Sequence, residues 1–522
     1  MTPPPKSRSC FLPSFGSTIF LGIFIILLLK SGSILLADGD TGYHIRTGEY
    51  IIQNWTVPTH DLFSYLAPPP AWTAHEWLSE VIMAVIYRAS GLTGIVICFS
   101  FFLAVTHVWL YRSLKNTCRD IVLVIGITAV AVATSSTHWL ARPHIFSLAL
   151  TLVWYQALDD YQVSHRNTLI YLPPLMLLWV NLHGGFVIGL LLLVIYACGN
   201  FLRALTAPPS IAEQSFAKGK QLALSAVLCT AVTAINPQGY DILLYPFKVT
   251  ADRVLMDGVA EFLSPNFHQA LPFKYMLLIL IASLAWSRAR LHPIEVGLIV
   301  LFTYMALYSV RYVSLFAIIV SRPLLRMLES VFSRMPPQFL HVYKRRLHNL
   351  AALEASMSHY VWPAIAVSMT VALAHVGIIH FEFSKTRFPV AAVEFLKREA
   401  ITGNIFNLDE FGDYMIFAAW PQYRVFIDGR SDMYGASRIK DYRKIADGQP
   451  EWQETIDKYD ISWVFFDPRS PIAAILKSQN NWSLIYSDEV ASIFVRNNPQ
   501  HQSLIDKYGK VVSFNEAKLT RN

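Results

Sequence analysis

Two aspartates in a short polar segment have the types and spacing that suit chemistry. Asp38 and Asp40 stand in the sequence Asp-Gly-Asp-Thr-Gly-Tyr-His, directly after an apolar stretch. A fixed carboxylate can take the proton of a weak nucleophile such as a hydroxyl or an amide, or hold a divalent cation that neutralises a phosphate leaving group. We therefore expect Asp40 and Asp38 to be catalytic, with Mg²⁺ or Mn²⁺ as the candidate cofactor. The alternative is that both are solvated acids that stabilise the N-terminus of the following helix.

Further ionisable side chains follow in the same polar segment. Glu76 stands next to His75 and could be a second catalytic carboxylate, so Asp40 and Glu76 are the candidate metal ligands. His44 closes the aspartate motif. His44 and His75 are therefore further candidates for a site in this segment.

Basic residues elsewhere in the chain suit a phosphate. Arg142, His144 and Arg311 are candidates because a guanidinium gives a bidentate, permanently charged clamp and stabilises charge that develops on a leaving group. For each of them the alternative is headgroup contact or snorkelling at the membrane interface. His183 is a fourth candidate, although Asn181-Leu-His-Gly-Gly185 could be only a tight turn in which glycine supplies the backbone conformation.

The elements that must position these residues are membrane spans. Of the 522 residues, 54% are hydrophobic and only 15% are charged, whereas a soluble domain is nearer a quarter charged. The net charge of +7 is expected from basic cytoplasmic loops, so the predicted partner is the lipid bilayer and not nucleic acid. Eleven apolar stretches are long enough to span, at 16–37, 90–112, 120–137, 144–161, 168–183, 185–203, 220–236, 272–287, 292–309, 311–328 and 358–380.

The distribution of charge predicts the orientation of these spans. With a cytoplasmic N-terminus, the inner loops hold most of the lysines and arginines, among which we count Arg322 and Arg326, and the C-terminal region lies outside. The predicted location is a bacterial inner membrane. Ionisable groups near a bilayer are costly and mark a site by default. The topology sends one set of them to the extracytoplasmic face: Asp38, Asp40, His44, His75, Glu76, Arg142, His144, His183, Glu261 and Arg311.

The chain divides by character into four segments. The boundaries are a cytoplasmic N-terminus at 1–15, a transmembrane domain at 16–384 with its first outer loop at 38–89, a soluble domain at 385–498 and a polar tail at 499–522. Within the first outer loop, a surface helix is predicted over Glu76–Ala89. The fold class is a multi-pass α-helical membrane protein with a small extracytoplasmic α/β domain. In that domain the patterns predict helices at 390–399 and 452–458, and strands at 404–407, 424–427, 463–467, 482–486 and 491–496.

Taken together, these residues resemble those of the GT-C-type glycosyltransferases, the superfamily of oligosaccharyltransferases and protein mannosyltransferases that use polyprenyl-phosphate-linked sugars. Asp38-Gly-Asp-Thr-Gly-Tyr-His-Ile-Arg46 is similar to the acidic first-loop motif of the oligosaccharyltransferase catalytic subunit. There, an Asp followed by an aromatic residue, His and Arg precedes an amphipathic helix. The resemblance implies that Asp40 or Asp38 is the catalytic or metal-binding acid and that the other outer-face residues belong to a lipid-phosphate cleft.

Two stretches qualify this resemblance. The oligosaccharyltransferase carries a Trp-Trp-Asp-Tyr-Gly signature that recognises its acceptor, and the nearest stretch here, Leu408-Asp-Glu-Phe-Gly-Asp-Tyr414, lacks the tryptophans. Trp179 to Gly185 is similar to segments of the Trp-x-Asn-Leu-His-Gly-Gly type in bacterial membrane proteins, many of which have no assigned substrate.

The leading hypothesis is a glycosyltransferase that moves a sugar from a polyprenyl phosphate or pyrophosphate to a glycan or protein acceptor outside the cytoplasm. A transporter or flippase of lipid-linked glycans is the second hypothesis, which predicts inverted repeats and polar helices near the membrane midplane. The third is a non-catalytic envelope assembly protein, in which the first-loop acids would tolerate neutral substitution.

Overall fold

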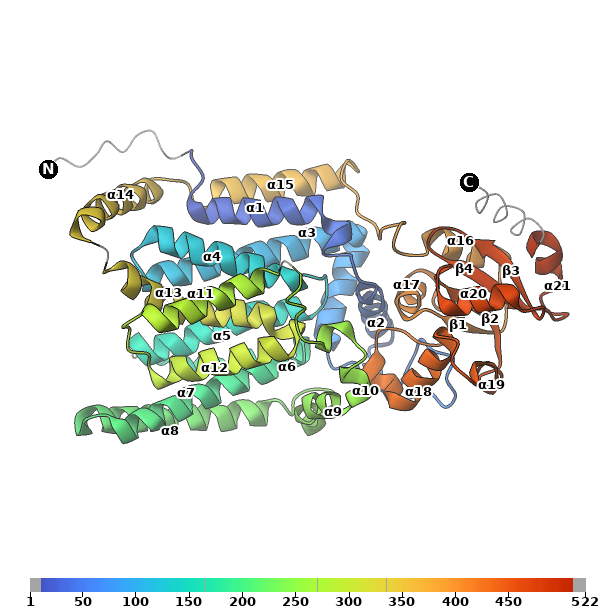
Figure 1. The fold of residues 1–522 in the computed structure, drawn as a ribbon, viewed down its shortest axis with the longest axis horizontal. Coiled ribbons are helices and arrows are strands. Elements are labelled where there is room, and N and C mark those ends of the chain that lie inside the picture. The colour runs from blue at the N-terminus through green and yellow to red at the C-terminus, as the bar shows by residue number, and fades with distance from the viewer. Residues whose placement is uncertain (1–10, 165, 270, 335, 510–522) are drawn as a thin grey trace. The chain divides into compact units, whose positions relative to one another are not determined.

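The computed structural model describes residues 11–164, 166–269, 271–334 and 336–509 of the chain (Figure 1). Most of the predicted N-terminal segment 1–15 and the last part of the predicted tail, 510–522, lie outside the described residues.

Two compact units divide the chain. Unit 1 comprises Met1–Leu35, Leu92–Leu244 and Val259–His380, and unit 2 comprises Leu36–Gly91, Tyr245–Gly258 and Phe381–Asn522. The predicted first outer loop, 38–89, therefore belongs to the unit of the C-terminal domain and not to that of the apolar helices.

Unit 1 is a helical bundle, in which α7 packs along α8 and α13 packs along α4 and α12 (Figure 1). Each of the eleven predicted apolar stretches contains a helix. These eleven helices are α1 (Phe15–Leu29), the part of α3 (Trp77–Thr117) from Leu92, α4 (Ile121–Ser135), α5 (His144–Ser164), α6 (Leu172–Leu182), α7 (Phe186–Thr206), α8 (Pro209–Val232), α11 (Pro272–Trp286), α12 (Pro293–Tyr308), α13 (Val313–Phe332) and α15 (Val361–His375). Helix α14 (Pro337–Ala355) lies between the last two stretches.

Three helices of the described part of the chain are long and apolar enough to cross a membrane. They cover Trp77–Thr117, Ile121–His138 and Phe186–Thr206. Shorter apolar helices occupy Phe15–Leu29, Thr168–Leu182, Pro272–Trp286, Pro293–Tyr308 and Val361–His375. The prediction of a mostly helical membrane protein is confirmed, whereas the number of eleven spans is not.

Two arginines that we counted as loop charges lie inside a helix. Arg322 of α13 is only 7% exposed, forms an ion pair with Asp159 of α5 and donates to Ser113 Oγ at 2.6 Å. Arg326, one turn further along α13, pairs with Glu295 of α12. Counting them as loop charges was wrong, because a count of charges does not separate a solvated arginine from one that is paired between helices.

Helix α3 bends where the two units meet in the sequence. Ser90 has φ −149° and ψ 17°, and Gly91 has φ +60° and ψ −158°, which is a conformation that favours glycine. The predicted surface helix Glu76–Ala89 and the predicted stretch from residue 90 are thus the two arms of one bent helix.

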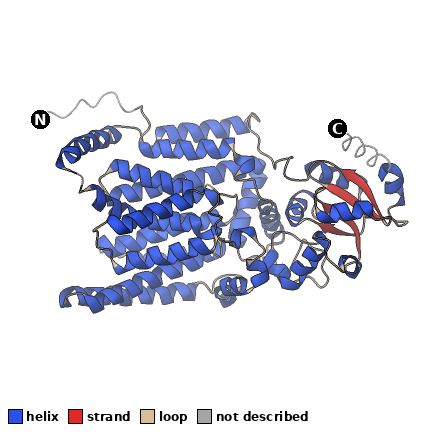
Figure 2. Ribbon diagram, viewed as in Figure 1, coloured by secondary structure: helices blue, strands red, loops and turns tan. Residues whose placement is uncertain are grey.

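Unit 2 contains a four-stranded mixed sheet with the strand order β1-β2-β4-β3 (Figure 2). The strands are β1 (Asn404–Asn407), β2 (Ile461–Phe466), β3 (Trp482–Ser487) and β4 (Ser492–Arg496). Strands β1 and β2 are parallel, and the other two pairs are antiparallel. The helices of the unit are α2 (Asp40–Asn54), the first arm of α3, α9 (Tyr245–Ala251), α10 (Arg253–Met256), α16 (Val390–Glu399), α17 (Asp409–Ala419), α18 (Ser431–Ala446), α19 (Trp452–Lys458), α20 (Pro471–Ser478) and α21 (Gln502–Leu504).

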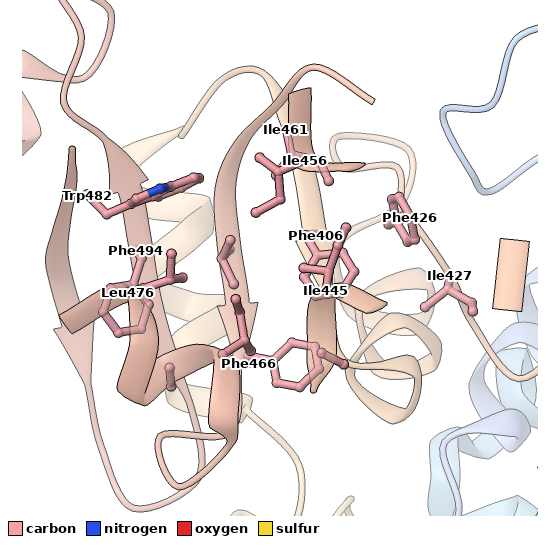
Figure 3. Packing of buried hydrophobic residues seen from close by; sticks show 14 of the residues in the cluster. Phe406, Phe426, Ile427, Ile445, Ile456, Ile461, Phe466, Leu476, Trp482 and Phe494 are labelled. Atoms are coloured by element: carbon pink, nitrogen blue, oxygen red, sulfur yellow. The ribbon is translucent and has the colours of Figure 1, made fainter. Parts of the chain in front are cut away.

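Buried apolar side chains fasten α18, α19 and α20 to one face of this sheet (Figure 3). Phe406 of β1 and Phe466 of β2 stack with ring centroids 5.4 Å apart. Ile445, Ile456 and Leu476 pack from the three helices. The alternation of helix and strand signals therefore predicted a real α/β domain.

Four of the five predicted strands and both predicted helices of this domain are confirmed, with small shifts at the ends. The strand predicted over Arg424–Ile427 was wrong. The Asn407 side chain donates to Ile427 O and accepts the Phe426 N–H, both at 2.8 Å, so it replaces the strand partner that this segment lacks. Val425 instead pairs with residues 63–65, where its N–H donates to Phe63 O at 3.0 Å.

The described part of the predicted tail packs onto the domain. Gln500 donates to Thr402 Oγ1 at 2.8 Å, and Tyr508 donates to Glu399 at 2.7 Å. Polar composition alone had indicated a loose tail over these residues, yet their polar groups are used in hydrogen bonds.

Candidate functional site

The ten predicted site residues fall into two groups, one in each unit. Unit 2 holds Asp38, Asp40, His44, His75 and Glu76. Unit 1 holds Arg142, His144, His183, Glu261 and Arg311. The candidate catalytic acids therefore belong to the unit that contains the sheet, and all the candidate phosphate ligands belong to the helical bundle.

Glycines bring helix α2 against helix α17. A Cβ atom on Gly39 would lie 2.6 Å from the Cβ of Asp413, and one on Gly42 would lie 2.6 Å from the Cβ of Phe417. Carbon atoms in contact are normally about 3.5–4.0 Å apart, so only glycine permits this approach. Arg46, one turn further along α2, donates from Nε to Phe417 O at 2.8 Å. The start of α2 is thus held close to Asp413.

The carboxylates of Asp40 and Asp413 meet over Gly429. A Cβ atom on Gly429 would overlap Asp40 Oδ1 and would lie 3.1 Å from Asp413 Oδ2. The Gly429 N–H donates to Asp413 Oδ1 at 2.9 Å, and the Asp40 N–H donates to Asp38 Oδ1 at 2.8 Å. The predicted acids Asp38 and Asp40, at the start of α2, therefore stand beside a third acid, Asp413 of α17. Of the three, Asp413 is the buried one.

Burial and neighbouring acids control the charge of this group. Asp413 is 3% exposed, and its burial, together with the negative charges of Asp40 and Asp428, raises the pKa of its carboxyl well above the usual range. The protonated form of Asp413 is therefore favoured beside the other acids.

A buried ion network flanks Gly429, whose N–H donates to Asp413. Arg430 donates to Asp428 from Nε at 2.8 Å and from Nη2 at 2.7 Å, and Nη2 also lies 2.8 Å from Asp61 Oδ1. Its guanidinium stacks over Trp72 at 4.5 Å from the ring centroid. Burial would raise the pKa of Asp61, but the Arg430 charge together with hydrogen bonds from Ser64, Phe63 and Arg430 lowers it. The network ties residues 61–72 to the turn at Asp428–Arg430. It thereby holds Gly429 beside the carboxylates of Asp40 and Asp413.

Glu76 belongs to a second polar group of unit 2. Its carboxylate lies 3.6 Å from His75 Nε2 and 4.0 Å from His44 Nε2. His44 Nδ1 lies 3.2 Å from Glu80 Oε1, and Glu80 is 1% exposed. The ring of His75 contacts that of Tyr245 at a centroid distance of 4.5 Å. The predicted residues His44, His75 and Glu76 are therefore neighbours.

These arrangements bear on the predicted cation. Asp40 faces Asp413, whereas Glu76 contacts two histidines, so the two candidate ligands belong to different groups of side chains. Among the described residues, no set of three or more His, Cys, Asp or Glu side chains is placed to hold a metal ion. The described side chains thus do not fit a preformed cation site.

In unit 1 an ion pair joins two of the predicted residues. Arg142 Nη1 lies 2.7 Å from Glu261 Oε1, and the Arg311 guanidinium stacks on Phe262 at 5.4 Å from the ring centroid. Burial would raise the pKa of Glu261, but Arg142, Arg311 and His138 together lower it to about 2. Two arginines with one carboxylate leave a net positive charge, which suits an anion.

Three histidines stand in line beside this pair. The rings of His138 and His144 lie 4.4 Å apart, and those of His144 and His183 lie 6.4 Å apart, measured between centroids. His144 is the first residue of α5, and His183 ends α6. Asn181 donates to Ile235 O and Asn236 donates to Val180 O, both at 2.9 Å. These two hydrogen bonds join the C-terminal end of α6 to the turn that follows α8. The predicted turn at His183 is real, and it also places the ring in this group.

The sequence analysis missed two acids and a serine. Asp413 and Glu80 are buried beside predicted residues, and Ser147 contacts His183. Glu80 stands four residues after Glu76 on a helix, a spacing that puts both on one face and could have indicated it. Asp413 and Ser147 gave no such signal, because their neighbours come from distant parts of the sequence.

Solved structures with a similar fold include two of the oligosaccharyltransferase of Archaeoglobus fulgidus. Its apo form aligns with a TM-score of 0.55 and 13% identity, over 87% of this chain and 68% of that chain. The archaeal oligosaccharyltransferase AglB in complex with an inhibitory peptide and a dolichol-phosphate aligns with a TM-score of 0.51 and 12% identity, over 92% and 74% of the two chains. No protein-family model and no curated protein matches the sequence. The chain therefore has a fold similar to that of these archaeal oligosaccharyltransferase structures.

Proposed function

We propose that the chain is a membrane glycosyltransferase that moves a sugar from a polyprenyl phosphate or pyrophosphate to an acceptor on the extracytoplasmic side. The observation that carries the proposal is the pair of Asp40 and buried Asp413, which a GT-C-type fold holds together over Gly429. The fold is similar to that of an oligosaccharyltransferase whose structure contains a dolichol-phosphate and an inhibitory peptide. This similarity supports a lipid-linked donor and a glycan or protein acceptor.

In this transfer an acceptor hydroxyl or amide attacks the anomeric carbon of the sugar. The bond between that carbon and the phosphate oxygen breaks, and the phosphate leaves with the bonding electrons. Asp40 takes the acceptor proton as the general base, beside the buried Asp413, whose raised pKa favours its protonated form. We assign Asp38 to the orientation of Asp40, because its carboxylate accepts the Asp40 N–H.

The basic group of unit 1 would bind the phosphate. Arg142 and Arg311 supply positive charge, and His144 and His183 supply ring nitrogens. Glu261 offsets part of this charge before the lipid phosphate arrives.

The test follows the lipid product, so it needs no knowledge of the acceptor. Purified protein is mixed with membranes that contain lipid-linked sugars, and the release of polyprenyl phosphate is measured by mass spectrometry. Asp40→Asn should reduce release at least about 100-fold, the effect of losing a general base. Asp241→Asn is the matched control, because Asp241 is exposed and lies in a predicted outer loop. Full release by a folded Asp38→Asn/Asp40→Asn protein would refute the assignment of these acids, whereas no release by the wild-type protein would favour a transporter or an assembly protein.

A further inference from the structure

A relay of hydrogen bonds in unit 1 fixes the tautomer of His183. Trp179 Nε1–H donates to Ser147 Oγ at 2.7 Å, and Ser147 Oγ lies 2.8 Å from His183 Nδ1. The Gly185 N–H also donates to His183 Nδ1, at 2.8 Å. A backbone N–H can only donate, so Nδ1 carries no proton and the ring proton resides on Nε2. Trp179 and Ser147 are buried, at 0% and 6% exposure, which keeps water from competing.

A second relay of the same composition gives a contrast within the same unit. Trp139 Nε1–H donates to Ser135 Oγ at 3.0 Å, and Ser135 Oγ lies 3.3 Å from His107 Nε2. His107 Nδ1 lies 2.8 Å from Leu103 O, which can only accept, so His107 carries its proton on Nδ1. Both nitrogens of His107 are used inside the bundle. This relay is structural, and its histidine has the opposite tautomer to His183.

Space explains why glycine follows His183. A Cβ atom on Gly185 would lie 2.5 Å from Ser147 Oγ and 2.8 Å from His183 Nδ1. The φ of Gly185 is −65°, which any residue adopts, so the backbone does not require glycine here. Glycine is needed at this position because the serine and the ring meet where a side chain would be.

We propose that His183 binds the phosphate of the lipid as a neutral hydrogen-bond donor through Nε2, and that Ser147, Trp179 and Gly185 are positioning residues that hold this tautomer. This inference rests on the proposed function and specifies the protonation state in which His183 binds the phosphate. Arg142 and Arg311 already bring two positive charges to this group, of which Glu261 offsets one. Another cation in the group would be repelled by the charge that remains, whereas a neutral N–H adds a directed hydrogen bond without that cost.

The full-length protein in detergent is titrated with geranylgeranyl phosphate by calorimetry. Ser147→Ala and Gly185→Ala should each weaken binding about tenfold, the loss expected for one hydrogen bond. The matched controls are Ser135→Ala, which removes the same link from the structural relay, and Gly126→Ala in α4, where a Cβ meets nothing within 4 Å. Both controls should bind within about twofold of the wild type, a change below the weakest hydrogen-bond contribution.

A spectroscopic measurement separates positioning from a general loss of structure. In protein labelled with ¹⁵N-histidine, the His183 resonances are those that disappear in His183→Gln. The wild type should give a proton-bearing Nε2 and a proton-free Nδ1, and Gly185→Ala, whose Cβ would lie 2.8 Å from Nδ1, should give a mixture of tautomers. Equal affinity and equal tautomer in Gly185→Ala and Gly126→Ala would overturn the inference. A wild type that binds no geranylgeranyl phosphate would overturn the proposed function as well, whereas a wild-type His183 with its proton on Nδ1 would overturn this inference alone.

Discussion

Substitution of Gly42 by alanine should separate activity from stability. The new Cβ would lie 2.6 Å from Phe417 Cβ, and a carbon–carbon contact needs about 3.5 Å, so α2 and α17 must move apart by about 1 Å. Asp40 and Asp413 are carried by these two helices and must separate with them. A misplacement of about 1 Å costs on the order of 100-fold in rate, and we expect that loss in polyprenyl phosphate release.

The effect of the same change on folding should be small, because two contributions oppose each other. Overpacking costs about 1–3 kcal/mol, and alanine gains about 1 kcal/mol over glycine inside a helix, so the net loss is about 0–2 kcal/mol. Gly126→Ala has only the second contribution and should be slightly more stable with unchanged activity. Thermal unfolding in detergent and the lipid-release assay measure both quantities. Release by Gly42→Ala within twofold of the wild type would refute the reasoning that glycine packing positions the acids.

Two further predictions concern the ion pairs. Arg430→Ala leaves two carboxylates buried without their cation and should destabilise unit 2 by about 3–5 kcal/mol, measured by protease resistance of the C-terminal domain. Arg469→Ala breaks an exposed pair and is the control, and equal sensitivity of the two variants would contradict the argument. For Glu261, the folded pKa of about 2 lies below the usual 4.5. Its contribution of at most about 3 kcal/mol is therefore present above pH 4.5 and is lost as the pH falls toward 2. Glu261→Gln should flatten the fall of the unfolding temperature over this range, and an unchanged pH profile would show that the pair does not stabilise unit 1.

Local patterns were sufficient for the elements and for much of the site. Apolar length located a helix in each of the eleven stretches, and alternation located the four strands. Both signals depend on neighbours in the sequence. The strand predicted at 424–427 failed because its hydrogen bonds go to the side chain of Asn407 and to residue 63, which no local pattern contains.

The candidate site was predictable only as a list of residue types. Asp40 was selected by its motif, but its neighbour Asp413 comes from more than 370 positions away and is brought close by glycine contacts. The number of eleven spans stays a prediction, and the charges inside the bundle show a related limit of local patterns. Arg322 is paired inside the bundle, and composition does not distinguish such an arginine from one in a loop.

The same physical device recurs at the three places where function is proposed. At Gly42, Gly185 and Gly429, a missing side chain lets two chemical groups approach more closely than any other residue would allow. In each case a polar atom or a packed carbon occupies the space of the absent Cβ. A methyl group added at such a position displaces the neighbouring candidate ligand or base, whereas the polar residues themselves are unchanged. Alanine at these glycines is therefore a sharper test of the geometry than removal of the acids or histidines, which would abolish activity under any mechanism that uses them.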